Sequence, residues 1–141
     1  MRKSLSLILC AVVGLSGLAI SAAEKPSDDY SKAMKALGAA SVGIKKAAES
    51  EESASDFAAV AKLQTAARDA LVVVEQYWKG KAKDAEDIAA TAVKATADLG
   101  VASSLQSMEG VQQAAKELGA TCATCHAAHR ERGADNAWMI K

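Results

Sequence analysis

Residues 53–80 read SASDFAAVAKLQTAARDALVVVEQYWKG and carry the clearest helical pattern in the chain. Their apolar side chains recur every three or four residues, as they do on one face of an α-helix. The stripe runs through Phe57, Val60 or Ala61, Gln64, Ala67, Leu71, Val74 and Trp78. Ser53 or Ser55 is a suitable N-cap, and Gly80 is a natural helix stop. This stretch therefore predicts one long amphipathic helix.

The same spacing predicts three further helices outside this stretch. One begins at the N-cap Ser27 and runs to the polar residues 49–53, and another runs from about Asp84 to Gly100. The last starts between residues 104 and 108 and continues to about residue 132, where Gly133 stops it. Long helices joined by short links predict an all-α, antiparallel up-down-up-down four-helix bundle. Residues 134–141 fall outside this bundle, where they either pack back on it or fray.

Composition supports a helical fold and raises a packing problem. Half of the 141 residues are hydrophobic but only 4% are aromatic, 33 are alanine and one is proline. Few aromatic residues argue against a β-sheet protein, and the zero formal net charge gives no electrostatic footprint for nucleic acid. Alanine forms good helices but fills little core volume. We therefore expect another group to fill part of the bundle.

Residues 1–23 have the pattern of a secretory signal peptide. A basic start is followed by an apolar run over residues 5–20 and by the small residues Ser21, Ala22 and Ala23. The alternative is a membrane anchor, but the run contains Ser and Gly and is shorter than the ~20 residues of a span. Cleavage would discard Cys10 and leave residues 24–141 as a soluble, exported, periplasmic domain that no longer contacts the membrane. Without Arg2 and Lys3, 15 of the 17 basic residues remain against 17 acidic ones, a net charge of −2.

The motif with the most specific chemistry is Cys122-Ala123-Thr124-Cys125-His126, a C-x-x-C-H sequence. This pattern is typical of c-type haem attachment, in which two thiols form thioethers with the vinyl groups and the histidine binds the iron. On a helix, Cys122, Cys125 and His126 stand at i, i+3 and i+4 and share one face. An export signal agrees with this reading, because c-type haem is attached after export.

Three alternatives explain the motif less well. A thioredoxin-like pair belongs at the start of a helix that follows a strand, whereas this pair lies deep inside a predicted helix. A zinc site made with His129 would need four ligands from one face of one helix to surround a metal. A disulfide between Cys122 and Cys125 would strain the helix.

The motif and its position resemble the class II c-type cytochromes, the cytochrome c′ family, whose fold is a four-helix bundle. The resemblance covers nearly the whole mature chain. Residues 122–130, CATCHAAHR, resemble the family's ending, with His129 in place of the usual aromatic residue. Residues 34–38, MKALG, resemble the first helix of the family's low-spin branch, which implies that Met34 is the sixth iron ligand. The family often has a propionate-binding arginine where this chain has Tyr30, so Lys32 or Lys35 is a candidate substitute.

Helix geometry also favours Met34 as an iron ligand. Met34 lies seven residues after Ser27 and His126 lies seven before Gly133, so both are ~10 Å from the same end of the predicted bundle. Met108 is ~27 Å from His126 along one helix and cannot reach the iron. Met139 in the tail stays open as a rival, and a purely structural role for Met34 in the core stays open as well.

The sequence therefore predicts a mono-haem c-type cytochrome that carries single electrons between redox partner proteins. One covalent haem c is held by Cys122 and Cys125, with His126 and Met34 on the iron and with Trp78 and Arg130 as further pocket residues. Ile88 is expected nearby, and Ala33, Ala92, Ala115 and Gly119 are expected to make room for the ring. The alternative is a five-coordinate cytochrome c′ that binds NO or CO. The sequence shows no nucleophile paired with a base, so we do not expect an enzyme. Homodimerisation, which is frequent in the family, stays open.

Overall fold

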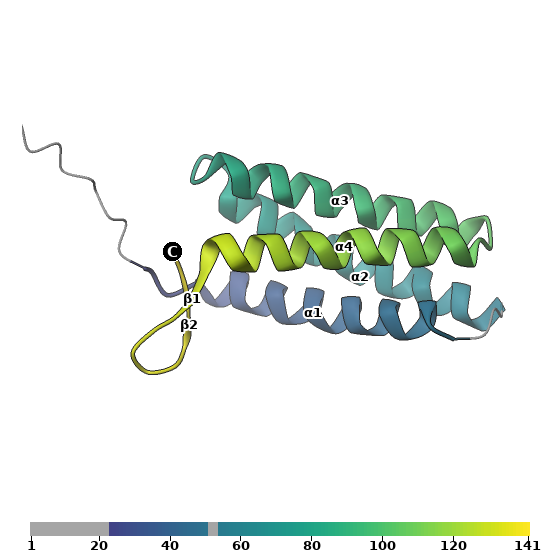
Figure 1. The fold of residues 1–141 in the computed structure, drawn as a ribbon, viewed down its shortest axis with the longest axis horizontal. Coiled ribbons are helices and arrows are strands. Elements are labelled where there is room, and N and C mark those ends of the chain that lie inside the picture. The colour runs from purple at the N-terminus through teal and green to yellow at the C-terminus, as the bar shows by residue number, and fades with distance from the viewer. Residues whose placement is uncertain (1–22, 51–53) are drawn as a thin grey trace, which may run out of the picture.

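The computed structural model describes residues 23–50 and 54–141, so all but the last residue of the predicted signal peptide lies outside the described part. Four helices form the body: α1 (Asp28–Ala48), α2 (Ala54–Trp78), α3 (Lys83–Ser104) and α4 (Met108–His129). Consecutive helices lie side by side and run back and forth along the molecule (Figure 1). The predicted all-α four-helix bundle is confirmed.

The helix ends follow local capping chemistry. The side chain of Ser27 accepts a hydrogen bond from the backbone N–H of Tyr30 at 3.2 Å, and Ser107 does the same for Gly110 at 3.2 Å. Gly80 adopts φ +75°, the left-handed conformation that follows a finished helix. The prediction that Gly100 ends the third helix is wrong, because α3 continues to Ser104.

Alanine allows the helices of this bundle to pack closely. Twelve of the 23 buried hydrophobic residues in the described part are alanine. The largest fully buried side chains are Ile44, Leu71, Leu99, Leu118, Val60, Val111 and Thr96. The contact between α1 and α4 is less extensive than those between helices consecutive in sequence. The bundle is therefore most open along the seam between α1, which carries Met34, and α4, which carries the cysteine–histidine motif.

A hairpin follows α4, and the prediction that the fourth helix extends to about residue 132 is wrong. Strand β1 (Arg130–Arg132) pairs antiparallel with β2 (Trp138–Ile140). Arg130 has extended backbone angles of φ −131° and ψ 136°. The guanidinium carbons of Arg130 and Arg132 each lie 3.5 Å from the centroid of the Trp138 ring, so cross-strand stacking accompanies the change from helix to strand. Of the two alternatives for residues 134–141, packing back is correct.

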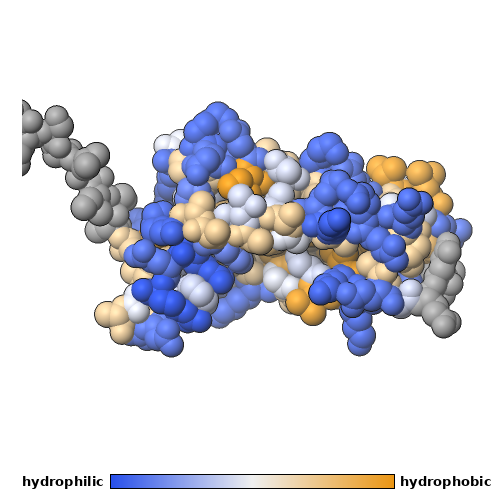
Figure 2. Space-filling model, viewed as in Figure 1, coloured by the Kyte–Doolittle hydropathy of each residue, from blue (hydrophilic) through white to orange (hydrophobic). Residues whose placement is uncertain are grey.

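The segment before α1 joins this hairpin. Glu24 and Ile140 exchange two backbone hydrogen bonds of 2.8 Å, and the side chain of Ile140 packs against the core. Figure 1 shows the hairpin and the start of α1 at one end of the bundle. The surface there is mostly hydrophilic, and the hydrophobic patches visible in Figure 2 lie over the helices. Among the described residues, no helix has the length and apolar character needed to cross a bilayer.

Candidate functional site

Two adjoining cavities lie at the hairpin end of the bundle. The inner cavity is lined by residues of all four helices and has a volume of about 30 Å³. The outer cavity has a volume of about 470 Å³ and is walled by α1, the C-terminal ends of α2 and α4, the hairpin and residues 25 and 26. Tyr30, Met34, Cys125 and His126 line both cavities. The site therefore extends from the core to the surface past these four side chains.

The two cysteines of α4 are free thiols that line the inner cavity. Cys122 and Cys125 are both free, and both are half-buried. Burial raises the pKa of each thiol, and for Cys125 the nearby Cys122 and Asp84 raise it further. Both line the inner cavity together with His126, as the i, i+3 and i+4 spacing predicts. The three groups of the motif are thus presented to one space.

His126 lies beside Cys125 and is also half-buried. Burial lowers the pKa of its imidazole, and the positive charge of Arg130 lowers it further. Both effects favour the neutral ring, which keeps a free lone pair on one nitrogen. A neutral imidazole is the form that binds iron. The environment of His126 therefore suits a metal ligand.

Met34 comes from α1 and lines the inner cavity together with the motif on α4. Its thioether side chain is half-buried and packs against the hydrophobic core. Met139 lines the outer cavity but not the inner one, and Met108 lies at the first residue of α4, far from His126. Of these three methionines, Met34 alone shares the inner cavity with the cysteine–histidine motif.

An aromatic cluster forms one wall of the site. The Trp78 indole is 3% exposed, and its Nε1–H donates a hydrogen bond of 3.2 Å to the hydroxyl of Tyr30. The ring of His129 stands 4.9 Å from the Trp78 ring, centroid to centroid, and its Nε2 lies 2.9 Å from Oδ2 of Asp84. Tyr77 contacts both Tyr30 and Trp78, at centroid distances of 4.2 and 5.2 Å. These contacts fix Trp78 where it lines the outer cavity.

The hydroxyl of Tyr77 connects this cluster to the segment before α1. It donates a hydrogen bond of 2.5 Å to Glu24, whose carboxylate also lies 3.4 Å from Nζ of Lys81. The pKa of Glu24 is lowered, first by the Tyr77 hydrogen bond and then by Lys81. Burial and the same carboxylate raise the pKa of Tyr77. Glu24 thus holds the N-terminal segment in place on two sides, against β2 and against α2.

The electrostatic character of the outer cavity is cationic. Lys25, Lys35 and Arg130 line it, and no Asp or Glu is among its described lining residues. Lys32, one of the two lysines considered from the sequence, does not line it and lies 3.8 Å from Asp29 instead. A cavity with three cations and no carboxylate suits a ligand with negatively charged groups.

The sequence located some neighbours of the site and missed others. Trp78 and Arg130 line the outer cavity, and Ile88 and Ala92 line the inner one, as expected. Ala33, Ala115 and Gly119 line neither cavity. The contributions of Lys25 and of the hairpin were missed, because no local pattern places residues 25 and 138–140 beside α4. Residues 23–50 and 54–141 contain no group of three or more His, Cys, Asp or Glu arranged to hold a metal.

The residues of the site fit a covalently attached haem. Two thiols, an imidazole and a thioether line one cavity, and the adjoining space is within the ~300–1,000 Å³ typical of ligand pockets. Comparison of the chain with protein-family models, with curated proteins and with solved structures finds no match.

Proposed function

We propose that this protein is an exported mono-haem c-type cytochrome that carries single electrons and that it is similar to the low-spin branch of the cytochrome c′ family. The proposal is carried by one observation: Met34, Cys122, Cys125 and His126 line a single cavity although they come from opposite ends of the mature chain. A disulfide or a thiol redox pair gives no reason for the imidazole and the thioether to be there. No catalytic role is proposed, and the partners are other redox proteins.

Each residue has a distinct part in this function. The Sγ atoms of Cys122 and Cys125 would hold the haem through thioether bonds, each thiol S–H adding across one vinyl double bond. His126 and Met34 would be the iron ligands. The bound haem supplies a one-electron iron couple, and Met/His ligation raises its potential. Trp78 and Arg130, which line the outer cavity, would border the ring.

The second candidate is a five-coordinate haem protein that binds NO or CO. It is favoured by the position of Met34 at the boundary of the outer cavity, which is large enough to bring a small ligand past the thioether. Two observations support binding of Met34 to the iron instead: α1 packs extensively against α2, and the side chain of Met34 packs against the hydrophobic core. The two functions differ in whether the sixth position is closed.

The deciding experiment is spectroscopic. The exported protein is purified and extracted with acidified organic solvent, and the oxidised and reduced absorption spectra are recorded with and without CO. We expect haem to stay with the polypeptide, the iron to be low-spin, and CO to bind poorly. Loss of all haem on extraction would refute the cytochrome proposal. Retained haem with a high-spin, CO-reactive spectrum would select the gas-binding alternative.

A further inference from the structure

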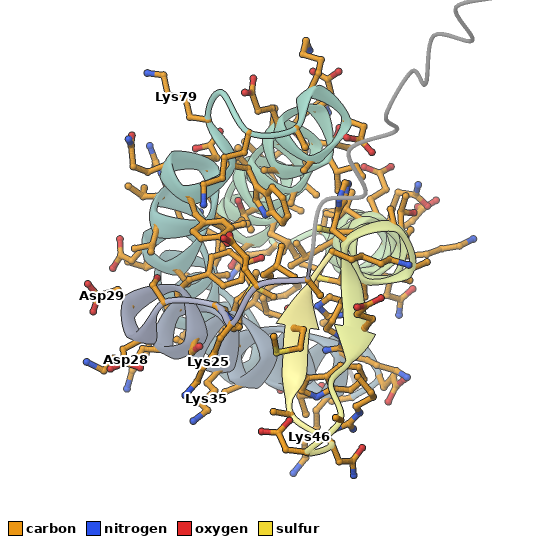
Figure 3. The ribbon with its side chains drawn as sticks, turned by 90° about the vertical axis from the view of Figure 1, so that its left-hand side faces the viewer. Lys25, Asp28, Asp29, Lys35, Lys46 and Lys79 are labelled. Carbon is orange, nitrogen blue, oxygen red and sulfur yellow. The ribbon has the colours of Figure 1, made fainter. Side chains whose placement is uncertain are left out.

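The mouth of the outer cavity carries positive charges that form no ion pair with a described residue. Lys25 precedes α1, Lys35 belongs to α1 and Arg130 belongs to β1. Both lysines are exposed, and none of the three forms an ion pair with a described residue. Figure 3 looks onto this end and labels Lys25 and Lys35 beside the start of α1, with Asp28 and Asp29 farther from the hairpin.

Two carboxylates close to the start of α1 in sequence have other partners: Glu24 binds Tyr77 and Lys81, and Asp29 pairs with Lys32. The described lining of the outer cavity has three cationic side chains and no carboxylate, so its charge is opposite in sign to that of the mature chain, which is −2 with 15 basic and 17 acidic residues. Such segregation concentrates a positive potential at one opening, where it can steer an approaching anion.

An exposed tryptophan lies at the same mouth. Trp138 is 41% exposed and lines the outer cavity. The guanidinium groups of Arg130 and Arg132 stack on its ring at 3.5 Å, which holds all three side chains in a fixed arrangement. Tryptophan and arginine are the residues most enriched among the energetic centres of protein interfaces. A pre-ordered Trp–Arg pair beside free lysines has the composition of a docking surface.

We propose that the rim formed by Lys25, Lys35, Arg130 and Trp138 is the docking surface for an acidic electron-transfer protein. The inference rests on the proposed function. The inner cavity is lined by residues of all four helices and shares lining residues with the outer cavity, so an edge of the bound haem would meet solvent at the outer cavity. A partner that exchanges electrons must approach this opening. Carboxylates on that partner meet the lysines, and an apolar spot between them meets Trp138.

The direction in which salt changes the rate of electron transfer to an anionic oxidant shows whether the cationic rim or the net charge of the whole molecule governs the approach. The probe is ferricyanide, a small anionic oxidant of the reduced protein. Repulsion by a net charge of −2 predicts that the rate constant rises with ionic strength, whereas a cationic mouth predicts that it falls. We expect it to fall. A rate that rises with salt would overturn the proposal.

Matched charge removals locate the effect. Lys25→Gln and Lys35→Gln should each slow the reaction several-fold at low ionic strength and flatten its salt dependence. The control is Lys46→Gln, which removes one charge from an exposed position near the other end of α1, ~16 Å from Lys35 along the helix. Equal slowing by Lys46→Gln would contradict a local surface. A lowered midpoint potential in Lys35→Gln with an unchanged rate would assign Lys35 to the haem carboxylates and also overturn the docking role.

A second readout does not depend on haem. The indole N–H resonances of the two tryptophans are followed by NMR while a short poly-glutamate peptide is added. The signal of Trp138 should shift, that of buried Trp78 should shift less, and both effects should weaken in Lys25→Gln. No perturbation of Trp138 would refute the surface. A preparation without covalent haem would refute the proposed cytochrome, while this titration would still report on the rim.

Discussion

The indole nitrogen of Trp78 donates a 3.2 Å hydrogen bond to the hydroxyl of Tyr30, which joins the last residue of α2 to the first turn of α1. Both side chains are buried, at 3% and 6% exposure. Tyr30 stands four residues before Met34, so this bond also orients the helix turn that faces the inner cavity. A single polar contact thus supports the geometry of the candidate iron site.

Tyr30→Phe should lower the free energy of unfolding by about 1–3 kcal/mol, because it leaves the buried Trp78 N–H without an acceptor. Chemical denaturation measures the loss. Tyr77→Phe is the matched control, since its hydroxyl bonds the exposed carboxylate of Glu24, which water can solvate. A loss in Tyr77→Phe as large as that in Tyr30→Phe would show that the buried bond has no special weight.

Met34→Ala should convert the low-spin spectrum of the haem-loaded protein to a high-spin one and increase CO binding, because the sixth position opens. Met108→Ala is the control, since Met108 also packs against the core but at the opposite end of the bundle. It should leave the spectrum unchanged. A low-spin spectrum that persists in Met34→Ala and disappears in Met139→Ala would transfer the ligand role to the hairpin.

Glu24 should titrate below the usual range for a glutamate, because Tyr77 and Lys81 stabilise its charged form. A group with a lowered folded-state pKa stabilises the fold above its unfolded value of ~4.3, and this stabilisation is lost as pH falls through the folded pKa. The side-chain carboxyl carbon, followed by NMR against pH, gives the midpoint. Tyr77→Phe should move it upward, and an unchanged midpoint would argue against the hydrogen bond as the main cause.

Glycines of α4 should respond to alanine in opposite directions. A Cβ atom at Gly110 would lie 2.9 Å from Cβ of Ala102, a contact that no side-chain rotation relieves, so Gly110→Ala should destabilise the protein by about 1–3 kcal/mol. A Cβ at Gly119 meets nothing within 4 Å, so Gly119→Ala should stabilise it by about 0.5–1 kcal/mol. Thermal unfolding of haem-free protein compares them. Stabilisation by both substitutions would mean that α3 and α4 do not approach closely at Gly110.

Haem attachment should stabilise the hairpin end of the bundle more than the opposite end. A ligand that binds the folded state raises its stability, and the ring would fill space beside small residues such as Ala92. Amide hydrogen exchange of the wild type is compared with that of the Cys122→Ala/Cys125→Ala variant. Protection should fall most around residues 118–126, and equal protection in both proteins would contradict the packing role.

The helices were predictable because each carries a long repeated signal. Ser27 caps α1 as predicted. Most of the predicted stripe of α2 is buried, whereas Ala61 is exposed and Gln64 is half-buried. The antiparallel order of the helices places the start of α1 and the end of α4 at the same end of the bundle, which is why the sequence predicted that Met34 lies near the motif. This prediction holds although α4 ends at His129 and not at about residue 132. The prediction that the third helix ends at Gly100 failed because Leu99 and Ala102 continue the buried face of α3 past this glycine.

The hairpin and the cationic rim were not predictable from local sequence. Strands of three residues are too short to show an alternating pattern, and their pairing depends on Arg–Trp stacking and on Glu24, far away in sequence. Lys25 has no local feature that distinguishes it from other exposed lysines. Its place beside Arg130 and Trp138 arises only when the segment before α1 pairs with β2.

The two hydrogen bonds between Glu24 and Ile140 bring distant parts of the chain within one strand spacing. A short linker from residue 140 to residue 24 could therefore close the chain into a ring. The ring could then be opened in the connection between α1 and α2 with every helix left whole. In such a rearranged chain the cysteine–histidine motif would come before Met34 in the sequence. The site depends on which helices are neighbours and not on the order in which they are synthesised.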